Sequence, residues 1–230
     1  MRNRVLIVLP LLVLAIPAMA QRVRVGAKGG VPINEYFETG PGYATSSYSS
    51  ATRRYTFGPS VEFNLWNNVG LEFDALYKRI GYNAIVSNRA RNPPFYTDTY
   101  EVTGSSWDFP LMLKYRFTKV PLYATAGGMI RHIGPVHGNG ERSGLRLVVV
   151  NGILISDRFT EPLDVPEPFD LRKRTWSGVT VATGVELRNG RFRVLPEFRY
   201  TRITSNISEP SIRTLGLNQN QAEFLLGFLF

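Results

Sequence analysis

Apolar and polar residues alternate one by one over long stretches of this chain. In the segment WDFPLMLKYRF, from Trp107 to Phe117, nearly every second residue is large and apolar, and Asp108, Lys114 and Arg116 lie between them. Successive side chains of a β-strand point to opposite faces, whereas a helix would spread these residues around its axis. The segment therefore predicts a strand with one apolar face and one largely polar face.

The same alternation recurs in seven further segments of similar length. The eight predicted strands lie at 22–31, 55–66, 69–81, 106–117, 121–132, 176–187, 191–203 and 219–230. Each has the roughly 9–11 residues with which a tilted strand crosses a bilayer. No segment between them carries a convincing amphipathic helix, so the sequence predicts an all-β domain.

The predicted connections alternate between short and long. Tight turns are expected at Asn67-Asn68, at 118–120 and at 188–190, where asparagine and glycine favour positive φ. The other connections are much longer, at 32–54, 82–105, 133–175 and 204–218. Short turns at one end and long loops at the other characterise outer-membrane barrels, whose strand number is even. The sequence therefore predicts an eight-stranded antiparallel up-and-down transmembrane β-barrel.

Alternation alone does not say which face is inside, because a soluble eight-stranded barrel would turn its apolar face inward. Aromatic residues are expected in two outward rings, as at membrane interfaces. One ring comprises Trp66, Phe117, Phe192, Phe228 and Phe230, and the other Tyr55, Tyr77, Trp107, Trp176 and Tyr200.

The opposite face is balanced in charge. It carries seven bases and seven acids: Arg24, Lys28, Lys78, Lys114, Arg116, Arg193, Arg199, Glu62, Glu72, Asp74, Asp108, Glu186, Glu197 and Glu223. A confined interior needs such a balance, because unpaired buried charge is costly. We therefore predict an interior network of ion pairs, and an apolar face that contacts lipid.

The first residues describe an export signal. Arg2 and Arg4 precede a short apolar run, and Ala18-Met19-Ala20 follows it, as in secretory signal peptides. We expect a signal peptide at 1–20 and a barrel domain at 21–230. Without Arg2 and Arg4 the net charge falls from +9 to +7. The chain has no cysteine, which excludes a disulfide framework, a thiolate metal site and a thiol nucleophile.

The last strand ends in a stripe of alternating apolar residues. Phe224, Leu226, Phe228 and Phe230 share one face. In this respect the chain resembles the small eight-stranded outer-membrane proteins of the OmpA transmembrane-domain, OmpX and OmpW group. The resemblance implies a bacterial outer-membrane location, contact with lipid and lipopolysaccharide, and recognition of the terminal stripe by the barrel-assembly machinery. It implies no cofactor and no nucleic acid, and a monomer is expected.

An eight-stranded barrel is just wide enough to be filled by side chains, here with Leu76, Met112 and Tyr123 added to the charges. We expect a closed, non-enzymatic scaffold. One alternative is a narrow conduit for small apolar solutes, as in OmpW-like proteins. Another is a lipid-modifying hydrolase, for which His132 with Ser105 or Ser106 is the weak catalytic candidate.

The long segment 133–175 contains the strongest turn signal of the chain. Asn151-Gly152 stands between two β-branched runs, which predicts a hairpin near 145–156. Its apolar residues are Val148, Val149, Val150, Ile153, Leu154 and Ile155. Either the hairpin binds an extracellular partner through an exposed edge, or it folds over the barrel mouth against the first two loops. The prediction for the whole chain is a structural or adhesive role through these loops.

Basic residues also gather in the predicted long loops, where they could bind the phosphates of lipopolysaccharide. They are Arg53, Arg54, Arg89, Arg91, Arg142, Arg172, Lys173 and Arg174. Acidic residues occur in the same loops, so a mixed solvated surface is the competing interpretation.

Overall fold

A computed structural model describes residues 23–39, 46–50, 55–88, 95–164, 174–204 and 215–230. The predicted signal peptide lies outside these ranges. The strands are β1 (Val23–Pro32), β2 (Phe37–Thr39), β3 (Ser46–Ser50), β4 (Thr56–Asn64), β5 (Val69–Asp74), β6 (Leu76–Asn88), β7 (Phe95–Arg116), β8 (Leu122–Val150), β9 (Ile153–Asp164), β10 (Thr175–Val185), β11 (Leu187–Asn189), β12 (Phe192–Ile203), β13 (Leu215–Leu217) and β14 (Asn220–Leu229). Within the described ranges, no helix is long and apolar enough to cross a membrane.

Eight strand positions close into a ring, which confirms the predicted architecture. The order is β1, β4, β5 with β6, β7, β8, β10, β12 and β14, and all pairs are antiparallel. β5 and β6 form one ring strand that is interrupted at Ala75, whose N–H donates to the carbonyl of Pro59 at 3.0 Å. β1 and β14 close the ring from Gly26↔Leu229 to Pro32↔Glu223.

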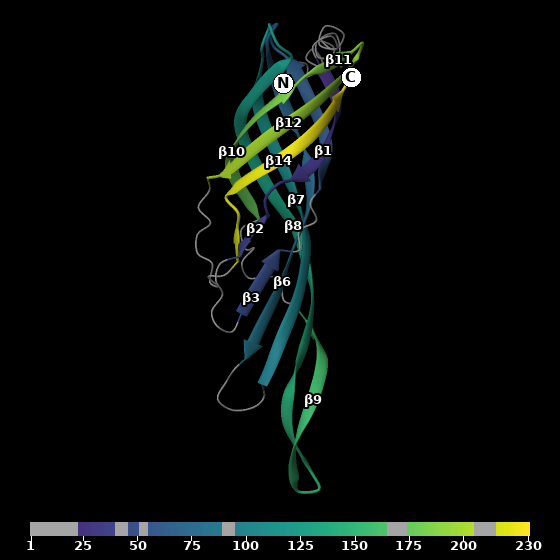
Figure 1. The fold of residues 1–230 in the computed structure, drawn as a ribbon, viewed down its shortest axis with the longest axis vertical. Coiled ribbons are helices and arrows are strands. Elements are labelled where there is room, and N and C mark those ends of the chain that lie inside the picture. The colour runs from purple at the N-terminus through teal and green to yellow at the C-terminus, as the bar shows by residue number, and fades with distance from the viewer. Residues whose placement is uncertain (1–22, 40–45, 51–54, 89–94, 165–173, 205–214) are drawn as a thin grey trace, which may run out of the picture.

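Short turns join the strands at the C-terminal end of the barrel (Figure 1). They occupy 65–68, between β4 and β5, and 117–121, between β7 and β8. The third turn was predicted at 188–190, but β11 continues the strand through Asn189 and Gly190 takes the positive φ of 60°. In outer-membrane barrels this end faces the periplasm.

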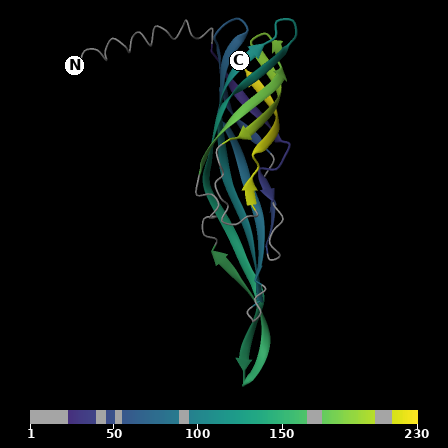
Figure 2. The same ribbon diagram turned by 90° about the vertical axis from the view of Figure 1, so that its left-hand side faces the viewer.

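The structure differs most from the prediction at the opposite end, where three ring strands do not stop. We expected long connections at 82–105 and at 133–175, the second with a hairpin near 145–156, but β6, β7 and β8 continue as one sheet beyond the ring. β8 alone is 29 residues long. Figures 1 and 2 show these strands leaving the barrel as a narrow ribbon. Residues 95–104 contain three threonines and two tyrosines, residue types that favour strands.

A hairpin of β8 and β9 forms the far end of this ribbon. The two strands pair from Asn139↔Asp164 to Val150↔Ile153. Asn151 and Gly152 have φ values of 52° and 79°, as a two-residue turn with the twist of the strands requires. The predicted bounds of 145–156 cover only the outer part. Beyond Leu145, β8 is paired with β9 alone, because its pairing with β7 ends at Phe95↔Leu145.

A segment after β1 returns to the mouth of the barrel. Tyr36 and Phe37 are 4% exposed and belong to a buried cluster with Ile80, Tyr82, Ala84, Val102, Met129, Ile133, Trp176 and Ile203. β2 pairs with β13 beside this cluster. An apolar layer therefore covers the interior at the ribbon end of the ring.

The orientation of the two faces follows the predicted alternation. In β14, Phe224 and Phe228 are about half exposed on the outside, whereas Leu225 and Leu229 are buried inside. Trp66, Phe117 and Phe192 form an exposed aromatic ring at the turn end.

The assignment of Trp176 to the outer aromatic ring is wrong. Its side chain is 3% exposed and packs inside the barrel mouth. Val179 and Val181 face outward, and strand alternation then places Trp176 inward.

Candidate functional site

The barrel interior holds a dense set of ion pairs, and the first group surrounds Lys28. The Lys28 Nζ lies 2.9 Å from Glu197 and 3.3 Å from Asp74, and it also contacts Glu72. Arg199 bridges the same carboxylates, at 2.6 Å from both Asp74 and Glu197. These five side chains have almost no solvent exposure, so each charge depends on its neighbours for stabilisation.

A second group lies nearer the ribbon end. Arg131 donates from Nε and Nη2 to the two oxygens of Asp108, at 2.6 and 2.7 Å, and from Nη2 to Gln221 at 2.8 Å. Lys78 bridges Asp108, at 2.7 Å, and Glu223. The ring of Tyr36 covers the guanidinium of Arg131 with 4.9 Å between ring centroid and Cζ.

A third group lies at the turn end, and it is rich in arginine. Glu62 contacts Arg24 at 2.5 Å, Lys114 at 2.8 Å and Arg116. The other carboxylate of this group, Glu186, accepts hydrogen bonds at 2.9 Å from Nε of Arg116 and from Nε of Arg188, and it also contacts Arg193.

All fourteen predicted interior charges take part in ion pairs. Lys114 joins the turn-end group to the group around Lys28 through Glu62 and Glu72, whereas the group around Arg131 pairs within itself among the described contacts. The structure adds Arg131, which sequence reasoning missed, and Arg188 at the rim. The sequence contained a signal for Arg131, because it lies an even number of residues after Tyr123 on the same predicted strand and so shares its face, which we placed inside. Glycine and alanine blur that alternation in this strand.

The bases and acids of the interior are not evenly distributed along the barrel axis. The groups around Lys28 and Arg131 contain four bases and five acids, whereas the turn-end group contains five bases and two acids. With Arg131 and Arg188 added, the interior holds nine bases and seven acids, and the excess of bases lies at the turn end.

The proposed catalytic pair is not formed. His132 lies opposite Trp107 in the sheet and is exposed on the outer face, where its Nδ1 is 3.1 Å from Oγ1 of Thr175. Ser106 is fully buried on the inner face and accepts a hydrogen bond from Tyr36 at 2.9 Å. Ser105 lies at the irregularity in the pairing between Gly104 and Ser106, whereas His132 is paired with Trp107. The described residues contain no cluster of three potential metal ligands.

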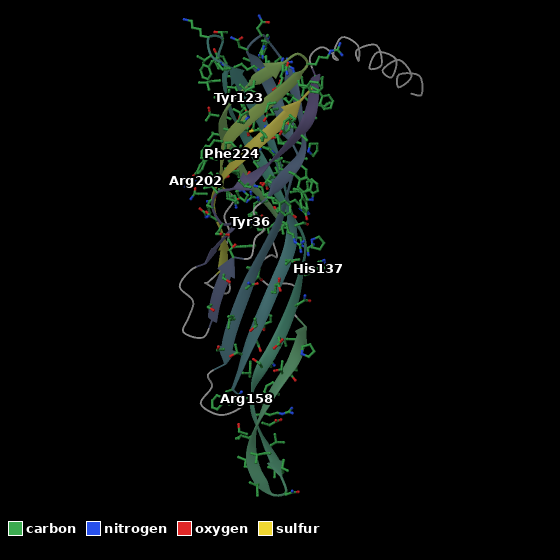
Figure 3. The ribbon with its side chains drawn as sticks, turned by 45° about the vertical axis from the view of Figure 1, so that its right-hand side comes forward. Tyr36, Tyr123, His137, Arg158, Arg202 and Phe224 are labelled. Atoms are coloured by element: carbon green, nitrogen blue, oxygen red, sulfur yellow. The ribbon has the colours of Figure 1, made fainter. Side chains whose placement is uncertain are left out.

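Among the large apolar residues of the ribbon, those at the hairpin tip have the highest exposed fractions. Val149, Ile153 and Leu154 are between 62% and 66% exposed, and Val148, Val150 and Ile155 adjoin them. Figure 3 shows how far this end lies from the barrel: Tyr36 is at the junction, His137 is on the ribbon and Arg158 is near the tip.

A separate ion pair holds the base of the hairpin to β7. Arg142 donates to both oxygens of Asp98, at 2.7 and 2.9 Å, and Tyr100 donates to Asp98 at 3.1 Å. The hydrogen bonds from Arg142 hold the pKa of Asp98 below its ordinary value. The other predicted loop bases lie outside the described residues, except Arg174, which has contacts of its own.

The lowered pKa of Asp98 predicts an acid-sensitive ribbon. A carboxylate with a depressed folded pKa stabilises the fold above its unfolded pKa, about 4, and loses this effect as the pH falls through the folded value. We expect amide NMR shifts of 95–104 to stay constant from pH 7 to 5 and to change below pH 4. Asp98→Asn should show the low-pH shifts already at pH 7. If D98N matches the parent at pH 7, the pair does not order the ribbon.

Comparison with known proteins gives a family for the first half of the barrel. Residues 18–131 match the model of a family described as the outer membrane protein beta-barrel domain. A search of curated proteins finds no significant match.

Several solved structures are similar at low identity. Neisserial surface protein A (NspA) is 13% identical, with 90% of this chain and 95% of that chain covered and a TM-score of 0.36. OprG from Pseudomonas aeruginosa is 10% identical, with 90% and 94% covered and a TM-score of 0.42. Ail, the attachment invasion locus protein of Yersinia pestis, is 9% identical, with 91% and 99% covered and a TM-score of 0.34. Scores below 0.5 say nothing about a shared function.

The family match and the closed ring agree in architecture, since both are β-barrels. The strands beyond residue 131 complete the ring that the matched region begins. Residues 18–131 therefore belong to the outer membrane protein beta-barrel domain family, and the closed ring of eight strand positions extends this architecture over the described chain.

Proposed function

We propose that this protein is a non-enzymatic surface adhesin, which uses a rigid barrel to hold an apolar hairpin away from the cell. The observation that carries the proposal is the exposure of the tip. Val149, Ile153 and Leu154 are more than 60% exposed at the end of the ribbon. Contiguous apolar surface in water marks an interaction site.

Both faces of the hairpin contribute to this surface. The cross-strand pair Val149↔Leu154 lies on one face, and Val150↔Ile153 and Val148↔Ile155 lie on the other. Beyond Leu145 both strand edges are also without a neighbouring strand in the described residues. A partner can therefore enclose the tip or extend its sheet.

The length of the ribbon favours outward binding over folding back across the mouth. At about 3.4 Å per residue, the run from His132 to Val150 reaches up to roughly 60 Å. The mouth itself is covered by Tyr36 and Phe37, and the tip residues are absent from that buried cluster.

The interior supports a scaffold rather than a conduit or a hydrolase. Large buried side chains fill the ring. They include Arg131 and Arg199 from the groups of charges, together with Tyr123. Conduction requires a roomy bore with spaced charges. His132 and Ser106 face opposite sides of the wall, which leaves the hydrolase without its pair. As part of the same proposal, the outward stripe of Phe224, Leu226, Phe228 and Phe230 is the signal for the barrel-assembly machinery.

Leu154→Asp tests the adhesive tip. We expect the retention of cells that display the protein on an alkyl-coated surface to fall about tenfold or more, since a buried leucine contributes about 1.5–3 kcal/mol. Deleting 145–156 should have the same effect.

Thr160→Asp is the matched control, because it adds the same charge to the same face of β9, outside the apolar tip. It should leave retention unchanged. Equal losses in both variants, or no loss in either, would contradict the proposal.

A further inference from the structure

The turn end of the barrel contains a pocket that the adhesive role does not use. It has a volume of about 320 Å³ and is lined by four arginines, Arg24, Arg116, Arg188 and Arg193. The rest of its lining is Asn64, Leu65, Trp66 and Asn67. We propose that this pocket binds a phosphate group.

The first support is the excess of positive charge. Among the described residues the four arginines form ion pairs with only two acids, Glu62 and Glu186, and Glu62 is shared with Lys114, which also contacts Glu72. Clustered like charges repel one another and raise the local potential. A bound dianion would remove most of this excess.

The second support is the supply of hydrogen-bond donors. A guanidinium has five N–H groups in a planar fork, yet within the described residues Arg188 donates only from Nε, to Glu186. Arg116 is 7% exposed, and its Nη2 contacts Glu62. Arginine forks match the oxygens of phosphate in pairs. The pocket therefore offers donors from several directions to one tetrahedral anion.

Glu62 and Glu186 do not occupy the pocket as substitutes for such an anion. Glu62 is 1% exposed and Glu186 6%, and Glu62 is not part of the lining of this pocket. Their carboxylates contact all four arginines. Arg24, Arg188 and Arg193 line the pocket, and the side chain of Arg188 is 60% exposed.

The position of the pocket defines two sources for the phosphate. It lies at the level of the exposed aromatic ring formed by Trp66, Phe117 and Phe192, where the headgroups of the inner leaflet lie. A phospholipid headgroup can reach it from the side, and a free phosphate compound can reach it from the periplasm. The shared ligand chemistry is a phosphate group held by arginine.

Arg188→Gln in the full barrel tests the site. Calorimetric titrations in a non-ionic detergent would use inorganic phosphate in one arm and short-chain phosphatidylglycerol in mixed micelles in the other. We expect saturable binding in at least one arm, weakened about tenfold by R188Q, as for the loss of one charge-assisted hydrogen bond. Binding of inorganic phosphate assigns a free ligand, and binding of the lipid alone assigns a headgroup.

Arg191→Gln is the control, since Arg191 is exposed in the neighbouring turn and does not line the pocket. Heat-modifiable gel migration should be the same for the parent and both variants. The inference is overturned if neither probe binds, if R188Q binds as tightly as the parent, or if R191Q weakens binding as much as R188Q. These results are independent of adhesion by the hairpin at the other end.

Discussion

Replacing Lys28 with methionine is expected to destabilise the barrel by about 3–5 kcal/mol, the usual loss when one partner of a buried ion pair is removed. Lys28 is 2% exposed and faces Glu72, Asp74 and Glu197. Without its ammonium group, Asp74 and Glu197 keep only Arg199 among the described bases, and Glu72 keeps Lys114 at 3.0 Å and Arg199 at 3.6 Å. Urea unfolding of the protein in lipid vesicles, followed by gel migration, would measure the loss.

Two further variants separate this effect from a general effect of the substitution. Lys119→Met makes the same change in the exposed turn 117–121 and should be nearly neutral. Lys28→Met with Glu72→Gln should recover part of the loss, because it removes one of the uncompensated carboxylates. If K28M and K119M unfold at the same urea concentration, the network does not stabilise the barrel.

Replacing Gly26 with alanine is expected to open the seam between β1 and β14. A Cβ atom at Gly26 would lie 1.8 Å from the carbonyl oxygen of Phe228. The obstacle is backbone and cannot rotate away, so the two strands must separate at the seam that closes the ring. Overpacking usually costs about 1–3 kcal/mol, and we expect the upper end of that range or more. The folded fraction after refolding, scored as the heat-modifiable band, is the measurement.

Gly29→Ala on the same strand is the control. Its added Cβ would face outward, with the nearest atom, the carbonyl oxygen of Thr56, at 3.8 Å. G29A should refold as the parent does. A G26A barrel that refolds equally well would show that the seam tolerates a wider separation than the register in the structure implies.

The sequence alone predicted the eight-stranded ring, because apolar and polar residues alternate with a period of two in most strands. A one-residue slip would put the charged face into lipid, so the pattern determined both the strands and their faces. Trp176 was the exception, because we assigned it by its residue type rather than by the alternation of Val179 and Val181.

The ribbon and the distribution of charge were less accessible to sequence reasoning. Residues 95–104 alternate polar with aromatic and β-branched residues and carry no apolar face, so they resembled a loop. The concentration of arginine around Glu186 depends on strand register and tilt, which bring Arg116 to a residue 70 positions away. The return of Tyr36 to the mouth depends on contacts made across the ring, which have no local signal.

The unbroken course of β8 has a mechanical consequence. One strand runs from the turn at Leu122 to the tip at Val150 and is paired along most of its length with β7. Backbone hydrogen bonds between antiparallel strands lie perpendicular to the strands. Tension applied to the tip along the axis is therefore a shear, shared by many bonds at once, and it reaches the bilayer through a single continuous backbone. Such an element withstands pulling far better than a hairpin that is peeled open bond by bond.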